Sequence, residues 1–270
     1  MQKKTYLVRG WRNFAACLLI MLSCSSLISA QAGETQNVVL LIRELRGENG
    51  DLVVIRDDIR QLLNYLEREA QLHFEIRYYP MQRLLLKAKA GEGVVFGLSK
   101  NSERLQSFRY SDTIYSNYVW LVTRQDANIV FNELSDLRGH TIGVIRGMSY
   151  GDEFERQKDT AFKVEEDISS HVARLKKLSL KRMDIMLFGD RRSNPREVEE
   201  LLHNLQRQDR SASGDDTAGE FKVLNKPLLV DALHFAAAFH THDAVLDRLN
   251  LAIATGKKSG EMTKILIPPK

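Results

Sequence analysis

Serine and arginine side chains that follow two apolar runs are the residues in this sequence best suited to binding chemistry. The run 94–98 leads into Ser99 and, after a polar turn, into Arg104. A guanidinium at the end of a strand can grip a small carboxylate with two parallel hydrogen bonds. A second run, 141–145, leads into a glycine turn and Ser149, where a helix start would offer free backbone N–H groups to an anion. Two such turns on separate strand–helix segments suggest a small solute held between two lobes.

The elements that must position these residues alternate between strands and helices. Apolar runs predict strands at 38–42, 73–79, 94–98, 141–145, 162–164, 184–188, 221–224 and 228–230. Helical spacing predicts helices at 55–66, 81–90, 132–137, a stretch from residue 149, 169–178, 196–206, 243–255 and 259–266. A polar loop is expected at 211–219, and Gly256 is expected to end its helix. The βαβαβ order implies an α/β fold with a mostly parallel sheet covered by helices.

The N-terminal segment predicts export through a cleavable signal peptide. Basic residues at positions 3, 4, 9 and 12 precede a mostly apolar stretch, 14–28, and an A-x-A cleavage site at 30–32. A transmembrane anchor, the alternative, needs roughly 20 apolar residues, and this stretch is shorter and interrupted by serines. A lipid anchor at Cys24 is disfavoured because the three residues before it form a poor lipobox. We therefore expect residues 1–32 to be removed and the protein to be periplasmic.

Removal of residues 1–32 changes what the composition implies. That segment holds four of the 39 basic residues and no acidic residue, which leaves 35 basic and 35 acidic residues and a formal net charge of zero. This balance gives no reason to expect nucleic-acid binding. Both cysteines, Cys17 and Cys24, are removed as well, so we expect no disulfide, no thiol nucleophile and no cysteine metal site. The roughly 240 residues that remain are enough for two lobes.

The sequence motifs predict neither a cofactor nor a metal. The chain contains no P-loop, no G-x-G-x-x-G fingerprint and no H-E-x-x-H. His240 and His242 would project from the same face of a strand, but no third ligand at a suitable spacing accompanies them.

Four stretches of the chain resemble family 3 periplasmic solute-binding proteins, the type that delivers polar amino acids to ABC transporters. The stretch 80–91 resembles the helix before the family's third strand, and 97–115 resembles its "s-x-t-x-eR … f-s-x-p-y" segment. The stretch 134–147 closely resembles its "l-x-d-L-x-G-k-x-v-g-v-x-x-G" segment, and 246–265 resembles its C-terminal helix pair. In order and spacing the resemblance covers nearly all of the chain after residue 32.

The resemblance implies a type II periplasmic-binding fold. Such a fold has two α/β lobes, each a mostly parallel sheet flanked by helices, which are joined by a two-strand hinge. On this chain it implies a first lobe at 33–116 and 233–270 and a second lobe at 117–232. The ligand is expected between the lobes, which would close on it by hinge rotation.

The resemblance also implies a set of ligand-binding residues. Arg104 matches the family arginine that grips the ligand's α-carboxylate, and Ser99 matches a polar contact from the first lobe. Ser149 matches a second-lobe hydroxyl at a helix N-terminus, and Tyr79 falls near a position that walls the side-chain pocket. Asp190 lies one residue out of register with the acidic residue that receives the α-amino group.

One departure and several simpler explanations stay open. The first loop, 43–50, is short and charged and lacks the family's aromatic residue, so another small carboxylate is an alternative to an amino acid. In the simpler explanations, Arg104 and Asp190 are surface charges, Ser99 and Ser149 are helix caps, and Tyr79 is a core residue.

Three functional classes remain compatible with the sequence. The first is a monomer, not an enzyme, that captures a small solute, an amino acid or related carboxylate, and presents it to an inner-membrane ABC permease. The second is a periplasmic lyase of the cyclohexadienyl dehydratase type on the same scaffold. It would need an acid near the leaving group, and Glu44, Glu48 and Asp190 are the candidates. The third is a ligand sensor read by a membrane receptor or kinase.

Overall fold

The computed structural model describes residues 35–45, 51–167, 170–213 and 219–267. The predicted signal peptide, most of the expected 211–219 loop and Glu48 therefore lie outside the described residues. Within those ranges, every helix is too short or too polar to pass through a bilayer.

The described residues form one sheet of nine strands. The strands are β1 (Gln36–Arg43), β2 (Leu72–Tyr79), β3 (Val94–Ser99), β4 (Phe108–Arg124), β5 (Thr141–Ile145), β6 (Lys163–Asp167), β7 (Ile185–Asp190), β8 (Phe221–Val223) and β9 (Leu229–Ala238). Their hydrogen-bonded order is β2-β1-β3-β9-β4-β7-β5-β6, with β8 paired to β4. All eight predicted strands are present, and their ends differ by three residues or fewer except in β9, which extends eight residues beyond the predicted 228–230. The long strand β4 was not among the predicted strands.

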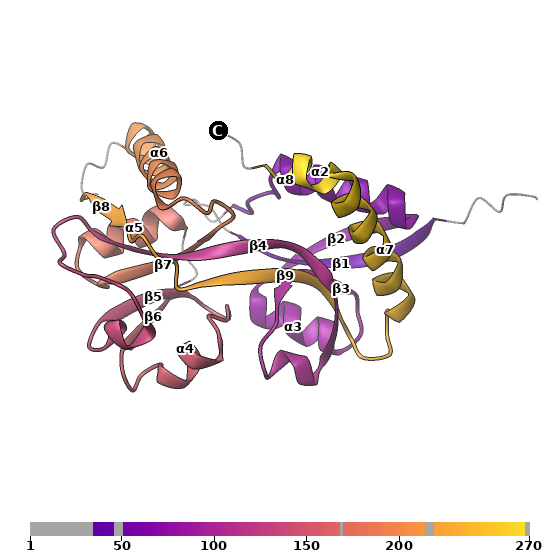
Figure 1. Cartoon of the computed structure of the whole chain (residues 1–270), viewed down its shortest axis with the longest axis horizontal. Coiled ribbons are helices and arrows are strands. Elements are labelled where there is room, and N and C mark those ends of the chain that lie inside the picture. The colour runs from indigo at the N-terminus through magenta and orange to yellow at the C-terminus, as the bar shows by residue number, and fades with distance from the viewer. Residues whose placement is uncertain (1–34, 46–50, 168–169, 214–218, 268–270) are drawn as a thin grey trace, which may run out of the picture. The chain divides into compact units, whose positions relative to one another are not determined.

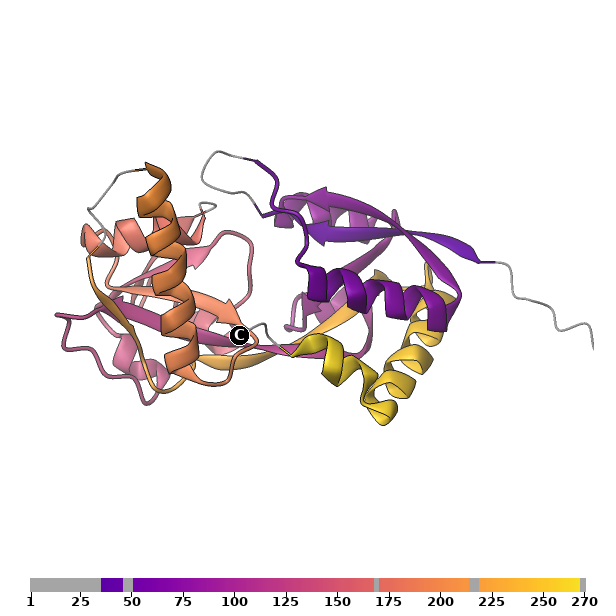
Figure 2. The same cartoon turned by 90° about the horizontal axis from the view of Figure 1, so that it is seen from above.

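Parallel pairing at both ends of this sheet is separated by two antiparallel strands in its middle. β1 pairs in parallel with β2 and β3, and β5 pairs in parallel with β6 and β7. The long strand β4 runs antiparallel to β9, and these two strands link the halves of the sheet. Figure 2 shows them crossing from one group of helices to the other. The fold is the two-lobed α/β arrangement, with β4 and β9 as its hinge strands.

Helices cover both faces of each half of the sheet (Figure 1). The α-helices are α2 (Asp57–Ala70), α3 (Met81–Lys89), α4 (Asp152–Gln157), α5 (His171–Ser179), α6 (Pro195–Ser213), α7 (Asp243–Ser259) and α8 (Glu261–Leu266). Two single 3₁₀ turns are η1 (Arg104–Gln106) and η2 (Leu134–Leu137). In one half α2, α7 and α8 lie on one face and α3 on the other; in the other half α5 and α6 lie opposite α4.

The buried apolar side chains divide between the same two halves. Two core clusters draw on β1–β3, α2, α3 and α7, and two others draw on β5–β8 and α4–α6. We call the first group of elements, with α8, the first lobe and the second group the second lobe. Along β4 the packing changes lobe between Ile114 and Val119, and along β9 between Phe235 and Leu229. The predicted lobe boundaries, 116/117 and 232/233, fall in these intervals and stay predictions.

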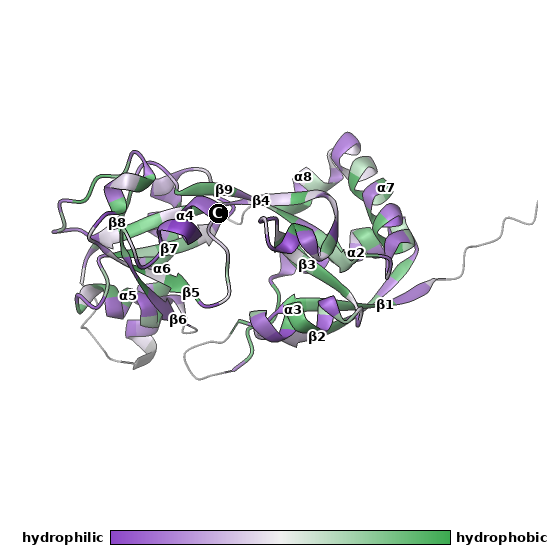
Figure 3. Ribbon diagram, turned by 90° about the horizontal axis from the view of Figure 1, so that it is seen from below, coloured by the Kyte–Doolittle hydropathy of each residue, from purple (hydrophilic) through white to green (hydrophobic). Residues whose placement is uncertain are grey.

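Hydrophobic patterning explains why these segments pack as they do. Figure 3 shows hydrophobic residues concentrated in the central strands and mixed with hydrophilic ones along covering helices such as α7. Helix α2 is representative, because Ile59, Leu62 and Leu66 recur at helical spacing and are buried. Its first turn also carries Asp57 and Asp58, which complement the positive end of the helix dipole.

The structure differs from the sequence expectations at the C-terminal helices. Gly256 does not end a helix; it lies inside α7, where a Cβ atom would come within 2.6 Å of Met262 and 2.8 Å of Tyr65. Its small size therefore allows α8 and α2 to approach α7. Gly260, with a positive φ of 77°, is the residue that ends α7. His240 and His242 lie in the turn before α7, so the strand geometry that would align their imidazoles does not occur.

Candidate ligand-binding site

Polar residues gather where parallel strands of the two lobes end. In open α/β sheets, ligands bind outside the carboxyl ends of the strands. In the first lobe β1 ends at Arg43 and β3 ends at Ser99, and in the second lobe β5 ends at Ile145 and β7 ends at Asp190. Hydrogen bonds link residues that follow β3 to residues that follow β5, so these ends face each other across the lobes.

Arg104 is a buried side chain that contacts both lobes. Only 5% of its surface is exposed, so it is not a surface charge. Its Nη1 atom donates to the Ser99 hydroxyl at 2.8 Å and to the Ser99 carbonyl at 3.1 Å, and its Nη2 atom reaches the Gly147 carbonyl at 3.4 Å. Burial lowers the pKa of Arg104, but an arginine stays protonated in proteins. A fixed positive charge therefore lies at the end of β3.

Asp231 and Tyr110 complete the surroundings of this arginine. Asp231 lies on β9, and burial raises the pKa of its carboxyl to about 6, although Arg104 and the Ser99 hydroxyl act in the opposite direction. The Tyr110 hydroxyl donates to the Ser99 carbonyl at 3.3 Å, and burial raises its pKa to about 12. Sequence reasoning missed Asp231. The signal available was an acidic residue at the start of an otherwise apolar strand.

Ser149 lies at the contact between the lobes. Its hydroxyl accepts a hydrogen bond from the Asn101 side-chain amide at 3.1 Å. Nearby, the Ser102 backbone N–H donates to Asp152 Oδ1 at 3.2 Å, and the two side chains are also hydrogen-bonded. Helix α4 begins only at Asp152, so Ser149 lies in the preceding loop and is not its N-cap. Ser99 likewise ends a strand and caps no helix.

The loop that contains Ser149 also matches the G-x-S-x-G pattern of serine hydrolases, which sequence reasoning overlooked. The match runs from Gly147 to Gly151 between β5 and α4. A nucleophilic serine needs a base within hydrogen-bonding reach. In the described part of the chain, the hydrogen-bond partner of the Ser149 hydroxyl is Asn101, an amide that cannot take a proton from it. The pattern therefore supplies a turn rather than an activated nucleophile.

Asp190 is buried and already paired. It ends β7, is 7% exposed, and so is not the surface charge that the simpler explanation supposed. Its Oδ1 atom accepts from the backbone N–H and from Nη1 of Arg192, both at 2.9 Å. Its Oδ2 atom lies 4.0 Å from Arg56 Nη1. The carboxylate is therefore held by cations of this chain, and less of its charge is available to an ammonium group of a ligand.

Tyr79 lies with helix α3 rather than with the residues around Arg104. It is the last residue of β2, and the side chains of Arg83 and Lys87 lie over its ring at 5.5 and 5.2 Å from the centroid. These contacts belong to the first lobe alone. Glu44, which follows β1, donates its backbone N–H to the Tyr79 carbonyl at 2.9 Å.

Sequence reasoning also missed a group of basic side chains in the second lobe. Arg174 on α5 is 0% exposed, and its Nη2 atom donates to the carbonyls of Gly143 and Leu187, both at 2.9 Å. Arg191, which follows β7, pairs with Asp58 of α2 and lies 5.4 Å from the centre of the Tyr115 ring. Arg174 could have been noticed because it shares the apolar face of its helix with Leu175 and Leu178.

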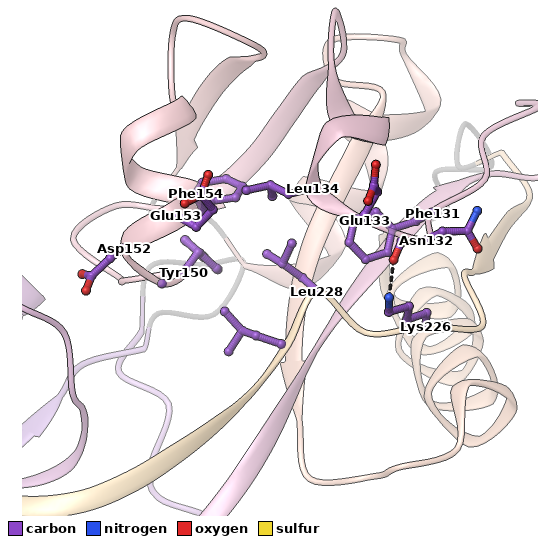
Figure 4. A pocket seen from close by; sticks show the side chains of 12 residues that line it. Phe131, Asn132, Glu133, Leu134, Tyr150, Asp152, Glu153, Phe154, Lys226 and Leu228 are labelled. Carbon is purple, nitrogen blue, oxygen red and sulfur yellow. Dashed lines mark hydrogen bonds between the residues drawn. The ribbon is translucent and has the colours of Figure 1, made fainter.

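A separate pocket lies in the second lobe (Figure 4). It is lined by parts of η2, α4 and the segment before β9, among them Phe131, Leu134, Phe154 and Leu228. Lys226 closes one side by donating to the Asn132 carbonyl. None of the five predicted ligand-binding residues lines this pocket. Among the described residues, no group of three or more His, Cys, Asp or Glu side chains could hold a metal ion.

Comparison with known proteins places this arrangement in a family. The sequence model of bacterial extracellular solute-binding proteins, family 3, matches residues 55–267. The chain belongs to this family. The matched residues include Arg104, the turn that follows β5 and both hinge strands, and they begin after β1. A search of curated proteins found no match to the chain.

Solved structures of amino-acid-binding proteins share the fold. An ancestral arginine-binding protein bound to arginine has a TM-score of 0.63 and 17% identity, with 86% of this chain and 97% of that one covered. The substrate-binding protein AbpA from Streptococcus pneumoniae, bound to L-arginine, has a TM-score of 0.60 and 15% identity, with 85% and 92% covered. The GluR0 ligand-binding core from Nostoc punctiforme, in complex with L-glutamate, has a TM-score of 0.60 and 15% identity, with 84% and 96% covered. At these identities the likeness shows the fold.

Proposed function

We propose that this family 3 protein binds a small solute with a carboxylate group, an amino acid or a related acid, between its two lobes. The observation that carries the proposal is the burial of Arg104 at the end of β3, with its guanidinium directed at Ser99 and at Gly147 of the second lobe. A carboxylate that leaves water needs charge and donors already in place. Arginine supplies both in one planar group.

The roles of the other predicted residues follow from their positions. Ser99 orients the Arg104 guanidinium and offers its hydroxyl to the ligand, and Ser149 offers a second hydroxyl from the opposite lobe. Asp190 takes the α-amino group only weakly, because Arg192 holds its carboxylate. Tyr79, whose ring lies against Arg83 and Lys87 of α3, is proposed only as a wall on the first-lobe side, with no polar contact to the ligand.

The biological role of this binding is delivery. We propose that residues 1–32 direct export to the periplasm and are removed, and that the monomer, with lobes at 33–116 plus 233–270 and at 117–232, presents its solute to an inner-membrane ABC permease. Ligand would favour the closed arrangement to the extent that it contacts both lobes better there. We propose no catalytic step. Of the acids named from the sequence for such a step, Asp190 is buried and paired with Arg192.

A thermal-unfolding screen of the exported form against amino acids and small carboxylates tests this proposal. A ligand at 100 times its dissociation constant adds about 2.7 kcal/mol to the free energy of unfolding, which raises the midpoint temperature measurably. We expect at least one carboxylate solute to do so, whereas the corresponding amine without a carboxylate does not. The proposal would be contradicted if none of the carboxylate solutes stabilised the protein.

A further inference from the structure

Arg174 is a fully buried cation whose hydrogen-bonding capacity is incompletely used. Its Nη2 atom donates to two backbone carbonyls, Gly143 and Leu187. Its Nε and Nη1 atoms are buried and have no hydrogen-bond partner among the described residues. A charge removed from water is costly unless an opposite charge or enough hydrogen bonds replace its hydration. The unused donors therefore indicate a missing acceptor.

Arg43 places a second positive charge beside Arg174, from the other lobe. It is the last residue of β1, and its side chain has no hydrogen bond or ion pair with the described part of the chain. Burial is the largest influence on the pKa of Arg174 and lowers it; Tyr150 and Asp167 act in the opposite direction, and Arg43 lies close enough to lower it further by a smaller amount. Two like charges repel each other, and an anion between them would attract both and outweigh that repulsion.

Two neutral donors accompany these arginines. Burial, together with Arg174 and Arg43, lowers the pKa of His171 to about 4, so its imidazole is neutral at ordinary pH. Its Nδ1 atom is buried without a partner. The Tyr150 hydroxyl accepts from the Ile145 N–H at 2.9 Å, which leaves its own proton for another acceptor.

The carboxylates of the surrounding elements are already engaged by other cations. Asp190 of β7 is paired with Arg192, and Asp167 of β6 is paired with Lys177 of α5. Asp58 of α2 is paired with both Arg56 and Arg191. The positive charge of Arg43 and Arg174 is therefore not balanced by an ion pair within the described residues.

We infer that the ligand carries a second carboxylate, bound between Arg43 of the first lobe and Arg174 of the second, with His171 and Tyr150 as further donors. This inference rests on the proposed function, in which Arg104 holds the first carboxylate. The ligand is then a dicarboxylate of small size, either an acidic amino acid or a diacid without an amino group. Because the two arginines belong to different lobes, the second carboxylate also favours lobe contact.

Calorimetric titration of the exported form with matched ligands tests this inference. L-Glutamate, glutarate and L-glutamine share a five-carbon chain; glutarate lacks the amino group, and glutamine replaces the second carboxylate by an amide. L-Aspartate, succinate and L-asparagine form a shorter series. We expect a dicarboxylate of one series to bind at least about tenfold more tightly than its amide, as the loss of a charge-assisted pair requires. Comparison of glutamate with glutarate then shows whether the amino group is recognised.

Variants locate the second carboxylate. Arg43→Gln and Arg174→Gln are each expected to weaken binding of the preferred dicarboxylate by about tenfold or more and to change binding of its amide by less than about threefold. Arg182→Gln removes the same charge from an exposed position after α5 and is expected to change neither. Thermal unfolding identifies any variant that does not fold, and the wild-type ligand series does not depend on the variants.

Three outcomes would overturn the inference. An amide that binds as tightly as its dicarboxylate, or unchanged dicarboxylate binding by both folded arginine variants, rejects the second subsite but leaves solute binding intact. Binding of neither series also rejects it. Only if the broader thermal screen finds no carboxylate ligand at all does the proposed function fail with it.

Discussion

The Arg104 guanidinium donates to the Ser99 hydroxyl at 2.8 Å and to the Ser99 carbonyl at 3.1 Å, so the two residues form one unit at the end of β3. The backbone of Arg104 is fixed as well, because its N–H donates to the Asn101 side chain at 2.8 Å. A side chain fixed in this way loses little conformational freedom when a ligand arrives.

Asp231 should make carboxylate binding depend on pH. Its carboxylate lies near Arg104 and competes with a ligand for that charge, and burial raises its pKa to about 6. Below pH 6 the group is neutral and the competition is lost, so we expect affinity for a carboxylate solute to rise as the pH falls from 7.5 to 5.5. Calorimetry at both pH values measures this. Asp231→Asn should bind tightly at both, and an unchanged pH dependence in that variant would reject the role of Asp231.

The same residue should influence the stability of the protein without ligand. Because the folded-state pKa of Asp231 is raised above its unfolded value, the folded state binds this proton more tightly. The resulting contribution is fully present below about pH 4 and is lost as the pH rises through about 6. It amounts to at most about 3 kcal/mol, and less where water reaches the carboxyl. Urea unfolding at pH 5 and pH 8 should therefore show a smaller difference for Asp231→Asn than for the wild type.

Much of the fold could be predicted because its signals are local. Apolar runs such as 38–42 and 94–98 gave the strands, and helical spacing gave α2 and α3. Gly256 was misassigned because glycine ends helices more often than it fills a close contact, and the contact with Met262 is not visible in the sequence. The hinge strands required the family resemblance, since β9 pairs with residues more than a hundred positions away.

The site was less predictable than the fold. Arg104 and Ser99 lie close in sequence and follow a strand, so local spacing brought them together. The group around Arg174 joins residues of α5, β1 and the β5 turn, and only the folded chain shows that they are neighbours. The engagement of Asp190 by Arg192 depends on side-chain orientation, which spacing does not determine.

Ligand should bring the lobes closer together. Ser102 of the first lobe and Asp152 of the second lobe are directly hydrogen-bonded, so the two lobes can contact each other at this point. We expect small-angle scattering to give a smaller radius of gyration at saturating ligand than in its absence. Asp152→Asn, which weakens the direct contact, should enlarge the difference by opening the free protein. Identical profiles with and without ligand would reject hinge closure while leaving binding unaffected.

Export should remove the N-terminal segment. The basic residues, apolar stretch and A-x-A site predict cleavage after Ala32. Intact-mass measurement of protein from the periplasm should therefore give a chain that begins at Gly33 or within a few residues of it. Ala32→Arg, which places a large charged residue at the cleavage site, should retain the full segment. A wild-type product that still begins at Met1 would show that the segment is not a cleavable signal.

Calorimetric titration of Arg104→Ala with the solute found by the thermal screen tests whether Arg104 holds the ligand's carboxylate. Loss of a charge-assisted pair from a desolvated site costs about 2–5 kcal/mol of binding, or roughly 30- to several-thousand-fold in affinity. Arg104→Lys should recover only part of this loss, because an ammonium cannot make two parallel hydrogen bonds. Arg60→Ala, an exposed arginine of α2, should bind as the wild type does. If folded Arg104→Ala binds the solute as tightly as the wild type, Arg104 does not hold the carboxylate and the solute binds elsewhere.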